Sequence, residues 1–144
     1  MNQIIKRSLL ASCVALAALT SAYAFDSEAP VVLPVESQVF EPLNPMIAMA
    51  GAWGDRATGQ HGTFGTFQPD FTTPFHTHTG AYHRVVIEGV MTNPFEGEAD
   101  APEMGPGSYW YVPAGAAHAT ACISDTPCRF YFHADEGFDF IMAE

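Results

Sequence analysis

The sequence contains few cations. Only five of its 144 residues are Lys or Arg, against 16 Asp or Glu, and the formal net charge is −11. A nucleic-acid-binding domain needs a basic face that neutralises phosphates, so this composition excludes that class of function. The same acidity argues against binding to an anionic membrane surface, which would repel the chain. The length is sufficient for one domain and leaves no room for a second large core.

Long hydrophobic runs are also lacking, apart from one near the start. Lys6 and Arg7 precede an apolar run over residues 9–19, and Ala22-Tyr23-Ala24 forms a small-x-small cleavage site. This three-part pattern is typical of a secretory signal peptide, and the run is too short to span a membrane. We therefore predict that residues 1–24 are a signal peptide and that the mature protein is periplasmic or secreted, without a membrane anchor. Cleavage would change the net charge from −11 to −13, because it would remove Lys6 and Arg7 and no acidic residue.

Cysteine is scarce. The sequence contains three, and only Cys122 and Cys128 follow the predicted signal peptide. An exported protein meets an oxidising compartment, which favours a disulfide between these two residues. The segment between them, residues 123–127, is typical of a turn, so the cysteines could face each other across a hairpin. A bridge would require the two Cα atoms to lie about 4.4–6.8 Å apart.

Helical periodicity is lacking as well. Beyond the signal peptide, no stretch with a helical period is longer than about two turns. About nine short apolar segments instead recur at a spacing of roughly 8–12 residues, which predicts the strands of a sandwich or a small barrel. A barrel of about eight strands has room for one small ligand. We expect an N-terminal arm over residues 25–40 and a single all-β domain over residues 41–144.

The sequence contains six histidines, and all of them follow the predicted signal peptide. His76 and His78 lie two positions apart on a predicted strand, so their side chains share one face. Two imidazoles on one face form half of a site that suits Zn, Cu, Fe or Ni. An exposed pair on a surface strand is the alternative for an isolated His-x-His. His61 could point into the barrel from an earlier strand, but its place near a predicted turn favours the surface.

The histidine pair belongs to a longer pattern. Residues 74–89 read PFHTHTGAYHRVVIEG, and residues 107–118 read G-x5-P-x-G-x2-H, ending at His118. The first segment resembles motif 1 of the cupin superfamily, and the second matches the core of motif 2. The chain is also similar to small exported single-domain bacterial cupins related to anti-sigma-factor-type cupins. The resemblance implies a double-stranded β-helix, the cupin jelly-roll barrel, with one divalent transition metal (Fe, Cu, Zn, Ni or Mn). It places His76, His78 and His118 at metal-ligand positions.

The acidic ligand of motif 1 has no direct counterpart. Counting back from Gly89 places Tyr82 there, whereas counting five residues forward from the His-x-His pair places His83 there. Strand alternation puts His83 on one face and Tyr82 with Arg84 on the other. Because a charged Arg84 would be costly inside an apolar barrel, we expect His83 to point inward as the fourth ligand. The sequence also departs from motif 2, since Cys122 stands where the last position is usually Asn.

These features predict a metal-dependent cupin, with more than one hypothesis about its activity. The first is a mononuclear-metal oxidoreductase, dioxygenase-like, that acts on a small oxygenated substrate bound by the metal. Tyr82 and His133 are then the candidates for proton transfer. The alternatives are a non-catalytic sensor or storage module for a small molecule or metal, and a barrel in which no metal binds. The resemblance also implies a homodimer, in which the N-terminal arm could exchange between subunits.

Overall fold

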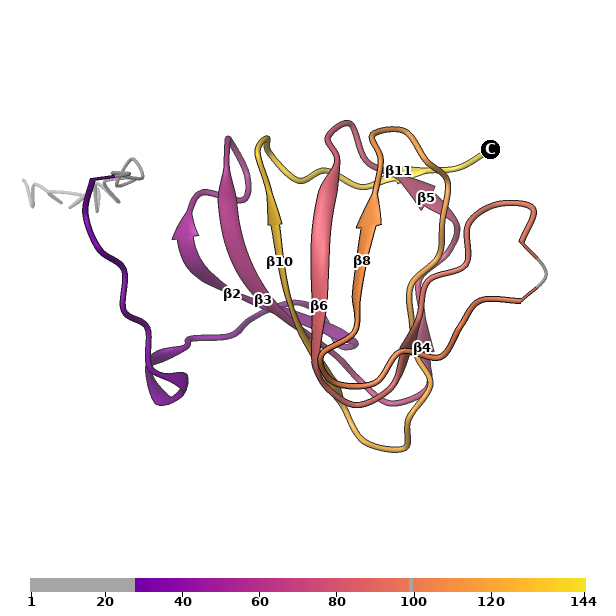
Figure 1. The fold of residues 1–144 in the computed structure, drawn as a ribbon, viewed down its shortest axis with the longest axis horizontal. Coiled ribbons are helices and arrows are strands. Elements are labelled where there is room, and N and C mark those ends of the chain that lie inside the picture. The colour runs from indigo at the N-terminus through magenta and orange to yellow at the C-terminus, as the bar shows by residue number, and fades with distance from the viewer. Residues whose placement is uncertain (1–27, 99) are drawn as a thin grey trace, which may run out of the picture.

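A computed structural model describes residues 28–98 and 100–144, and it has the all-β architecture predicted from the sequence (Figure 1). The predicted signal peptide lies outside the described residues. Within the described ranges the chain forms one short 3-10 helix and eleven strands. These are η1 (Val35–Ser37), β1 (Glu41–Asn44), β2 (Ile47–Gly54), β3 (His61–Phe67), β4 (Phe71–Thr72), β5 (His76–Thr77), β6 (Tyr82–Glu88), β7 (Met91–Thr92), β8 (Tyr109–Val112), β9 (Ala121–Cys122), β10 (Cys128–Ala134) and β11 (Ile141–Met142).

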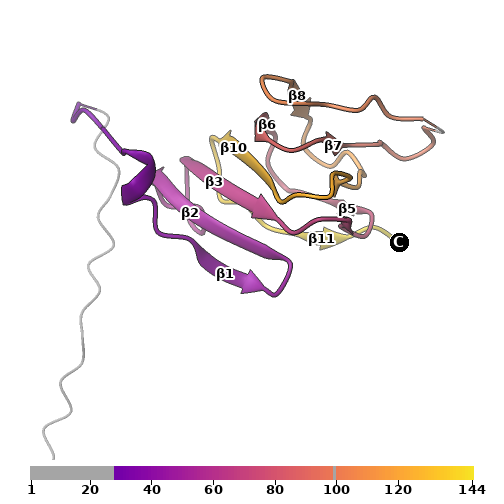
Figure 2. The same ribbon diagram turned by 90° about the horizontal axis from the view of Figure 1, so that it is seen from below.

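The strands form one large sheet and two small ones. The large sheet has the order β1-β2-β3-β10-β6-β8, and its neighbours are antiparallel. A three-stranded sheet has the order β4-β9-β7, and β5 pairs with β11. Figure 2 shows β11 running beside β5, so the C-terminal segment closes against a strand from the middle of the chain. Neighbours so far apart in sequence are characteristic of jelly-roll topologies.

Residues 28–40 form an arm that extends away from the barrel in Figure 1. Val32 and Val39 in this arm are exposed, and β1 begins directly after it, at the edge of the large sheet. Arg129 of β10 donates a hydrogen bond to the side-chain oxygen of Gln38, which ties the arm to the barrel. No helix of the described residues is long and apolar enough to cross a membrane.

Alternation along the central strands produces the core. On β10, Phe130 and Phe132 are completely buried, whereas Tyr131 and His133 between and after them are only half-buried. Phe67 of β3 meets Phe130 edge to face, with ring centroids 5.1 Å apart. Such aromatic pairs stabilise a core beyond the effect of their buried area alone. The inward faces of β3, β6, β8 and β10 therefore line one continuous hydrophobic interior.

β6 presents the opposite face to the interior from the one we expected. Tyr82 and Arg84 are buried, with exposures of 0% and 4%, whereas His83 is half-buried on the other face. The prediction that His83 points inward was therefore wrong. Arg84 lies directly opposite Phe132 of β10 in the antiparallel register. Because residues opposite each other share a face, the inward Phe132 also directs Arg84 into the barrel.

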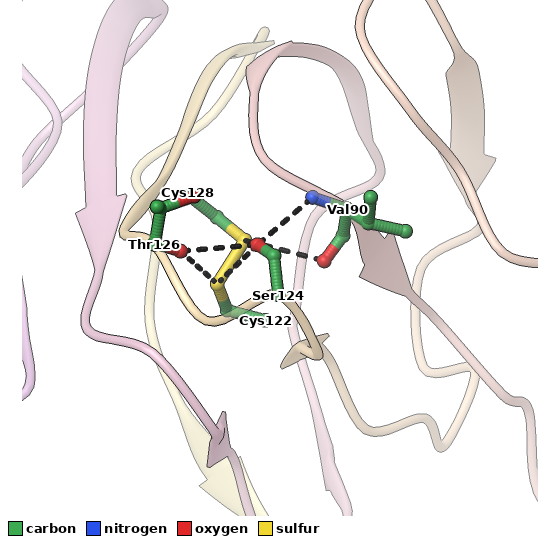
Figure 3. The surroundings of a disulfide bond; sticks show 5 residues. All are labelled: Val90, Cys122, Ser124, Thr126 and Cys128. Atoms are coloured by element: carbon green, nitrogen blue, oxygen red, sulfur yellow. Dashed lines mark hydrogen bonds between the residues drawn. A yellow bond between two sulfur atoms is a disulfide. The ribbon is translucent and has the colours of Figure 1, made fainter.

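Cys122 of β9 and Cys128 of β10 form a disulfide (Figure 3), the pairing that the export argument favours. Both cysteines are buried, and the bond links the three-stranded sheet to the large sheet. In the turn between them, the Ser124 hydroxyl accepts a hydrogen bond from the Val90 backbone N–H at 3.1 Å. It donates one to the Thr126 carbonyl at 3.0 Å. The disulfide and these hydrogen bonds thus fix the turn over residues 123–127.

Replacing both cysteines with serine should lower the free energy of unfolding by about 2 kcal/mol. The cross-link joins residues six apart, and closing so short a loop restricts the unfolded chain only modestly. Urea denaturation of the wild-type protein and of the Cys122→Ser/Cys128→Ser variant, without reductant, measures the difference. Reductant should destabilise the wild type by a similar amount and leave the variant unchanged. A wild-type protein that reductant does not affect would contradict the disulfide.

Candidate metal centre

The site begins with an opposed pair of histidines. The His76 backbone N–H donates to the His118 carbonyl at 2.9 Å, and the His118 N–H donates to the His76 carbonyl at 3.0 Å. Residues that exchange both backbone hydrogen bonds stand directly opposite in an antiparallel ladder, and their side chains share a face. The two imidazole centroids are 4.3 Å apart. His78 follows two residues after His76 and presents its ring to the same face, at 4.8 Å from the His76 ring.

The three imidazoles together form a histidine triad that could hold a metal ion. Each histidine offers one ring nitrogen to the site, and these three nitrogens all lie within 4.8 Å of one another. All three residues are buried. The Nδ1 atoms of His76 and His118 lie 2.9 Å from the carbonyl oxygens of Pro74 and Ala116. Nδ1 of His78 contacts the carbonyl of Asp139. Because carbonyl oxygens only accept, each Nδ1 carries the proton, and the lone pair of each neutral ring lies on Nε2.

Burial keeps the triad neutral. It lowers the pKa of His78 to about 3 and that of His118 to about 4, and it lowers the pKa of His76 as well. The hydrogen bonds to the backbone carbonyls oppose this effect, and the nearby charge of Arg84 adds to it. At neutral pH the three rings are therefore unprotonated at Nε2, which is the form that binds metals. Nε2 of His78 has no hydrogen-bond partner among the described residues, as expected for an atom that awaits a ligand.

Tyr82 lies against the triad from β6. Its hydroxyl is 2.9 Å from Nε2 of His118 and, with that nitrogen unprotonated, donates to it. The side chain is fully buried, and desolvation raises its pKa, so the phenol is protonated at neutral pH. Tyr82 is the residue that counting back from Gly89 places at the acidic position of motif 1, and it contacts the triad as a neutral phenol. The structure brings this predicted site residue to the site, with its O–H directed at a candidate ligand atom.

Two aromatic rings from the C-terminal segment cover the other side. Phe140 stacks on His76 with centroids 4.0 Å apart and Phe138 stacks on His78 at 4.1 Å. Between them, Asp139 supplies the carbonyl that binds His78 Nδ1, and its carboxylate accepts from the Thr79 N–H at 2.8 Å. A cavity of about 130 Å³ borders His76 and His78 beside these rings. The segment that precedes β11 thus orients the triad and forms one wall of the cavity.

A family model described as a domain of unknown function, DUF4437, matches residues 37–139, a range that includes the triad, Tyr82 and Phe138. The chain belongs to the DUF4437 family. The sequence matches no curated protein.

Solved structures relate this DUF4437 chain to cupins. An RmlC-like cupin from Shewanella frigidimarina is 14% identical and has a TM-score of 0.61, covering 72% of this chain and 87% of the other. The polyketide cyclase RemF from Streptomyces resistomycificus is 20% identical and has a TM-score of 0.67, and the match covers 81% of this chain and 87% of RemF. A sugar phosphate isomerase of the cupin superfamily from Silicibacter pomeroyi is 16% identical and has a TM-score of 0.60, and the match covers 77% of this chain and 92% of the isomerase. At these identities the likeness shows the fold alone, and it confirms the predicted cupin jelly-roll barrel.

Two predicted site residues of the DUF4437 chain lie away from the triad. His83 of β6 and His133 of β10 stack on each other, with centroids 4.7 Å apart, on the outer face of the large sheet. Nδ1 of His83 is 2.6 Å from the Tyr109 hydroxyl on that same face. The structure therefore corrects the assignment of His83 as fourth ligand and of His133 as a proton-transfer residue. Both side chains point away from the interior because alternate residues of their strands, not these, are buried.

His61 was also expected in the wrong environment. It is completely buried, with Nδ1 2.9 Å from the Thr63 hydroxyl and its ring edge-on to Phe132 at 5.2 Å. The nearby turn suggested the surface, but His61 begins β3 on the inward-facing register. It lies outside the group of candidate ligands.

The sequence analysis missed three residues that shape the site, namely Arg84, Phe138 and Phe140. Arg84 was assigned to the outer face because of its charge. Phe138 and Phe140 belong to the segment FDFIM, and their spacing of two already places both rings on one face of an extended chain. What the sequence did not reveal is that this segment crosses the histidine pair before β11 joins β5.

The metal-free protein should become less stable as the pH falls below about 6.5. The pKa values of His78 and His118 in the folded state, about 3 and about 4, lie below the usual value of 6.5. The unfolded chain therefore binds protons first, so the stability due to these residues is complete above 6.5 and is lost as the pH approaches the folded values. Urea denaturation at several pH values between about 7 and 5 measures this loss.

The matched variants are His78→Leu and His83→Ala. His78→Leu should show a shallower loss of stability with falling pH, because one buried imidazole is gone. His83→Ala should behave as the wild type, since its ring lies on the outer face. A free energy of unfolding that stays constant over this range in the metal-free wild type would contradict the account of the buried triad.

Proposed function

We propose that this protein is a metal-dependent cupin enzyme in which His76, His78 and His118 bind one divalent transition metal. The observation that carries this proposal is the hydrogen bonding of the rings, since each Nδ1 is held by a backbone carbonyl. That arrangement fixes the tautomer and the ring orientation, and it is what metal-binding histidines typically have. Neutral imidazoles suit Zn, Cu, Fe and Ni, and all three rings are buried where water competes little.

A small substrate that contains oxygen would bind beside the metal. Three protein ligands leave part of a coordination sphere open, as catalytic sites require. The cavity of about 130 Å³ borders two of the three candidate ligands. A bound divalent metal would act there as a Lewis acid towards a substrate oxygen. Phe138 and Phe140 exclude water from one side, and the Tyr82 hydroxyl is placed to donate or accept a proton close to His118.

For the reaction we propose oxidoreductase chemistry of the dioxygenase type. Three neutral imidazoles leave the full charge of a divalent ion in place, because Tyr82 stands where cupin motif 1 has a carboxylate. Such a centre favours anionic chelates, including enolates and deprotonated diols, which are substrates suited to oxygen chemistry. The fold does not select the reaction, since the structural neighbours include a cyclase and an isomerase. A redox-active metal supports the oxygenase proposal, whereas zinc would favour Lewis-acid catalysis or a non-catalytic binding module.

We also propose that the protein works outside the cytoplasm. The N-terminal sequence pattern supports export, and so does the disulfide, because such bonds persist in oxidising compartments. The acidic composition agrees with a small-molecule ligand rather than a nucleic acid.

The metal content of the mature protein, purified without a metal-affinity tag, tests the proposal. We expect close to one transition-metal ion per chain by inductively coupled plasma mass spectrometry. The His76→Ala/His118→Ala variant should contain almost none, because it removes two of three ligands. The metal found also decides the chemistry, since Fe or Cu fits the dioxygenase-type reaction.

The chain offers a matched control in a second pair of histidines. His83→Ala/His133→Ala removes the same number of imidazoles from the outer face and should keep the full metal content. Circular dichroism and thermal melting establish that both double variants are folded. If neither wild type nor reconstituted protein holds metal, or if both double variants lose it equally, the proposed metal centre is wrong.

A further inference from the structure

Arg84 is a buried cation without an acidic partner in the described part of the chain. Its side chain on β6 is 4% exposed, and it lies inside the barrel rather than on its surface. Nε and Nη1 have no hydrogen-bond partner among the residues that the structure describes. The ion pair recorded among residues 28–98 and 100–144 joins Arg129 to Glu88, and no carboxylate in those ranges lies within 4.0 Å of the Arg84 nitrogens. A guanidinium has five N–H donors, so most of its hydrogen-bonding capacity is unused.

The immediate surroundings of Arg84 are aromatic. The guanidinium carbon lies 4.2 Å from the ring centroid of Phe130 and between 5.1 and 5.3 Å from those of Tyr82, Trp110 and Phe132. Cation–π contacts of this kind offset part of the cost of burying the charge. They supply no hydrogen-bond acceptor, and a buried charge without one remains unfavourable. The rings hold the guanidinium in place while leaving its N–H groups available.

Arg84 borders the same cavity as the histidine triad. His76, His78 and Arg84 all line it, and its other walls are largely apolar, with Met49 and Phe67 among them. The volume of about 130 Å³ is close to that of a cavity which holds benzene, roughly 150 Å³.

Positive charge is otherwise rare in this chain, and it is concentrated here. Only three arginines and no lysine follow residue 24, yet two of the three, Arg56 and Arg84, line this one cavity. The carboxylate that borders the cavity, Asp139, is held by the N–H and the hydroxyl of Thr79. It therefore does not serve as the partner of Arg84.

We propose that Arg84 is the anion-binding group of this site, and that the ligand is a small organic acid. Its carboxylate accepts hydrogen bonds from the buried guanidinium, and its apolar body fills the cavity next to the histidine triad. This inference deepens the proposed function by naming the substrate class of the same site, and it rests on that proposal only for the metal. The planar fork of a guanidinium matches the geometry of a carboxylate. Of the two arginines that line the cavity only Arg84 is buried, and a single buried cation beside apolar walls favours a single negative charge over a phosphate dianion.

A metal ion bound by the triad would also favour an anionic ligand. Three neutral imidazoles leave the charge of a divalent ion uncompensated, and Arg84 adds another positive charge within the barrel. Charges interact strongly in a low-dielectric interior, so an anionic ligand between the two would be stabilised by both. A neutral ligand of the same shape would gain neither interaction.

Calorimetric titration of the metal-free and the metal-loaded protein tests the proposal with defined probes. These are butyrate and benzoate, their neutral isosteres butyramide and benzamide, and inorganic phosphate. We expect at least one carboxylate to bind at least tenfold more tightly than its amide, in the metal-free protein as well. Arg84→Met should abolish that preference, whereas Arg129→Met should keep it, because Arg129 is paired with Glu88 and lies away from the cavity.

Two further measurements separate ligand binding from a structural role. Arg84→Met replaces an unpaired buried cation with an apolar side chain, so the ligand-free variant should melt at a higher temperature than the wild type. A purely structural cation held by the aromatic rings would instead make the variant melt lower and leave carboxylate binding to the folded fraction unchanged. Arg84→Lys keeps the charge without the planar fork, and it should bind the carboxylate more weakly than the wild type and more tightly than Arg84→Met.

The outcomes distinguish this inference from the proposed function. If no carboxylate is preferred over its amide, or if Arg84→Met keeps the preference, Arg84 is not the anion-binding group. If phosphate alone binds, the assignment of an organic acid is wrong. If carboxylates bind through Arg84 while no variant or wild type holds metal, the metal-dependent function falls and the inference about Arg84 stands. Arg84→Met should retain the wild-type metal content, since Arg84 is not a ligand.

Discussion

Hydrogen bonds from three buried imidazoles to backbone carbonyls hold this site together. Pro74, Ala116 and Asp139 supply the carbonyls, and each bond directs the other ring nitrogen of its histidine towards the shared centre. Without these bonds the rings would have no fixed tautomer, and a buried N–H without a partner would destabilise the fold. Because the acceptors belong to the main chain, the geometry of the triad is a direct consequence of how the barrel strands are placed.

The placement depends on contacts between distant parts of the chain. His76 and His118 are opposed in an isolated antiparallel bridge between the two motif segments, and the C-terminal strand β11 returns to pair with β5. That return brings Phe138 and Phe140 over the histidines and the Asp139 carbonyl to His78. The same closure forms the cavity wall. The three histidines and Arg84 are thus buried beside large hydrophobic side chains such as Phe130 and Phe132.

Much of this could be predicted from the sequence, and the failures have clear physical reasons. The spacing of His76 and His78 and the G-x5-P-x-G-x2-H segment indicated both the barrel and three of the residues that the structure brings together. The inward face of β6 was predicted wrongly, because the cost of burying Arg84 was weighed without its aromatic surroundings. Four rings within 5.3 Å of the guanidinium carbon come from three strands, and strand alternation within β6 alone cannot show them. Once β6 is turned, His83 necessarily lies outside, and Tyr82 takes its place beside His118.

X-ray absorption spectroscopy of the metal-loaded protein tests the central claim most directly, because it reports the atoms bound to the ion. The account predicts three imidazole nitrogens at about 2.0–2.1 Å for a zinc-loaded sample, with the multiple scattering that identifies histidine rings. The remaining ligand or ligands should be light oxygen donors from water or a bound anion. A first shell of sulfur, or one of oxygen alone without histidine scattering, would contradict the account, because the metal would then not lie at His76, His78 and His118.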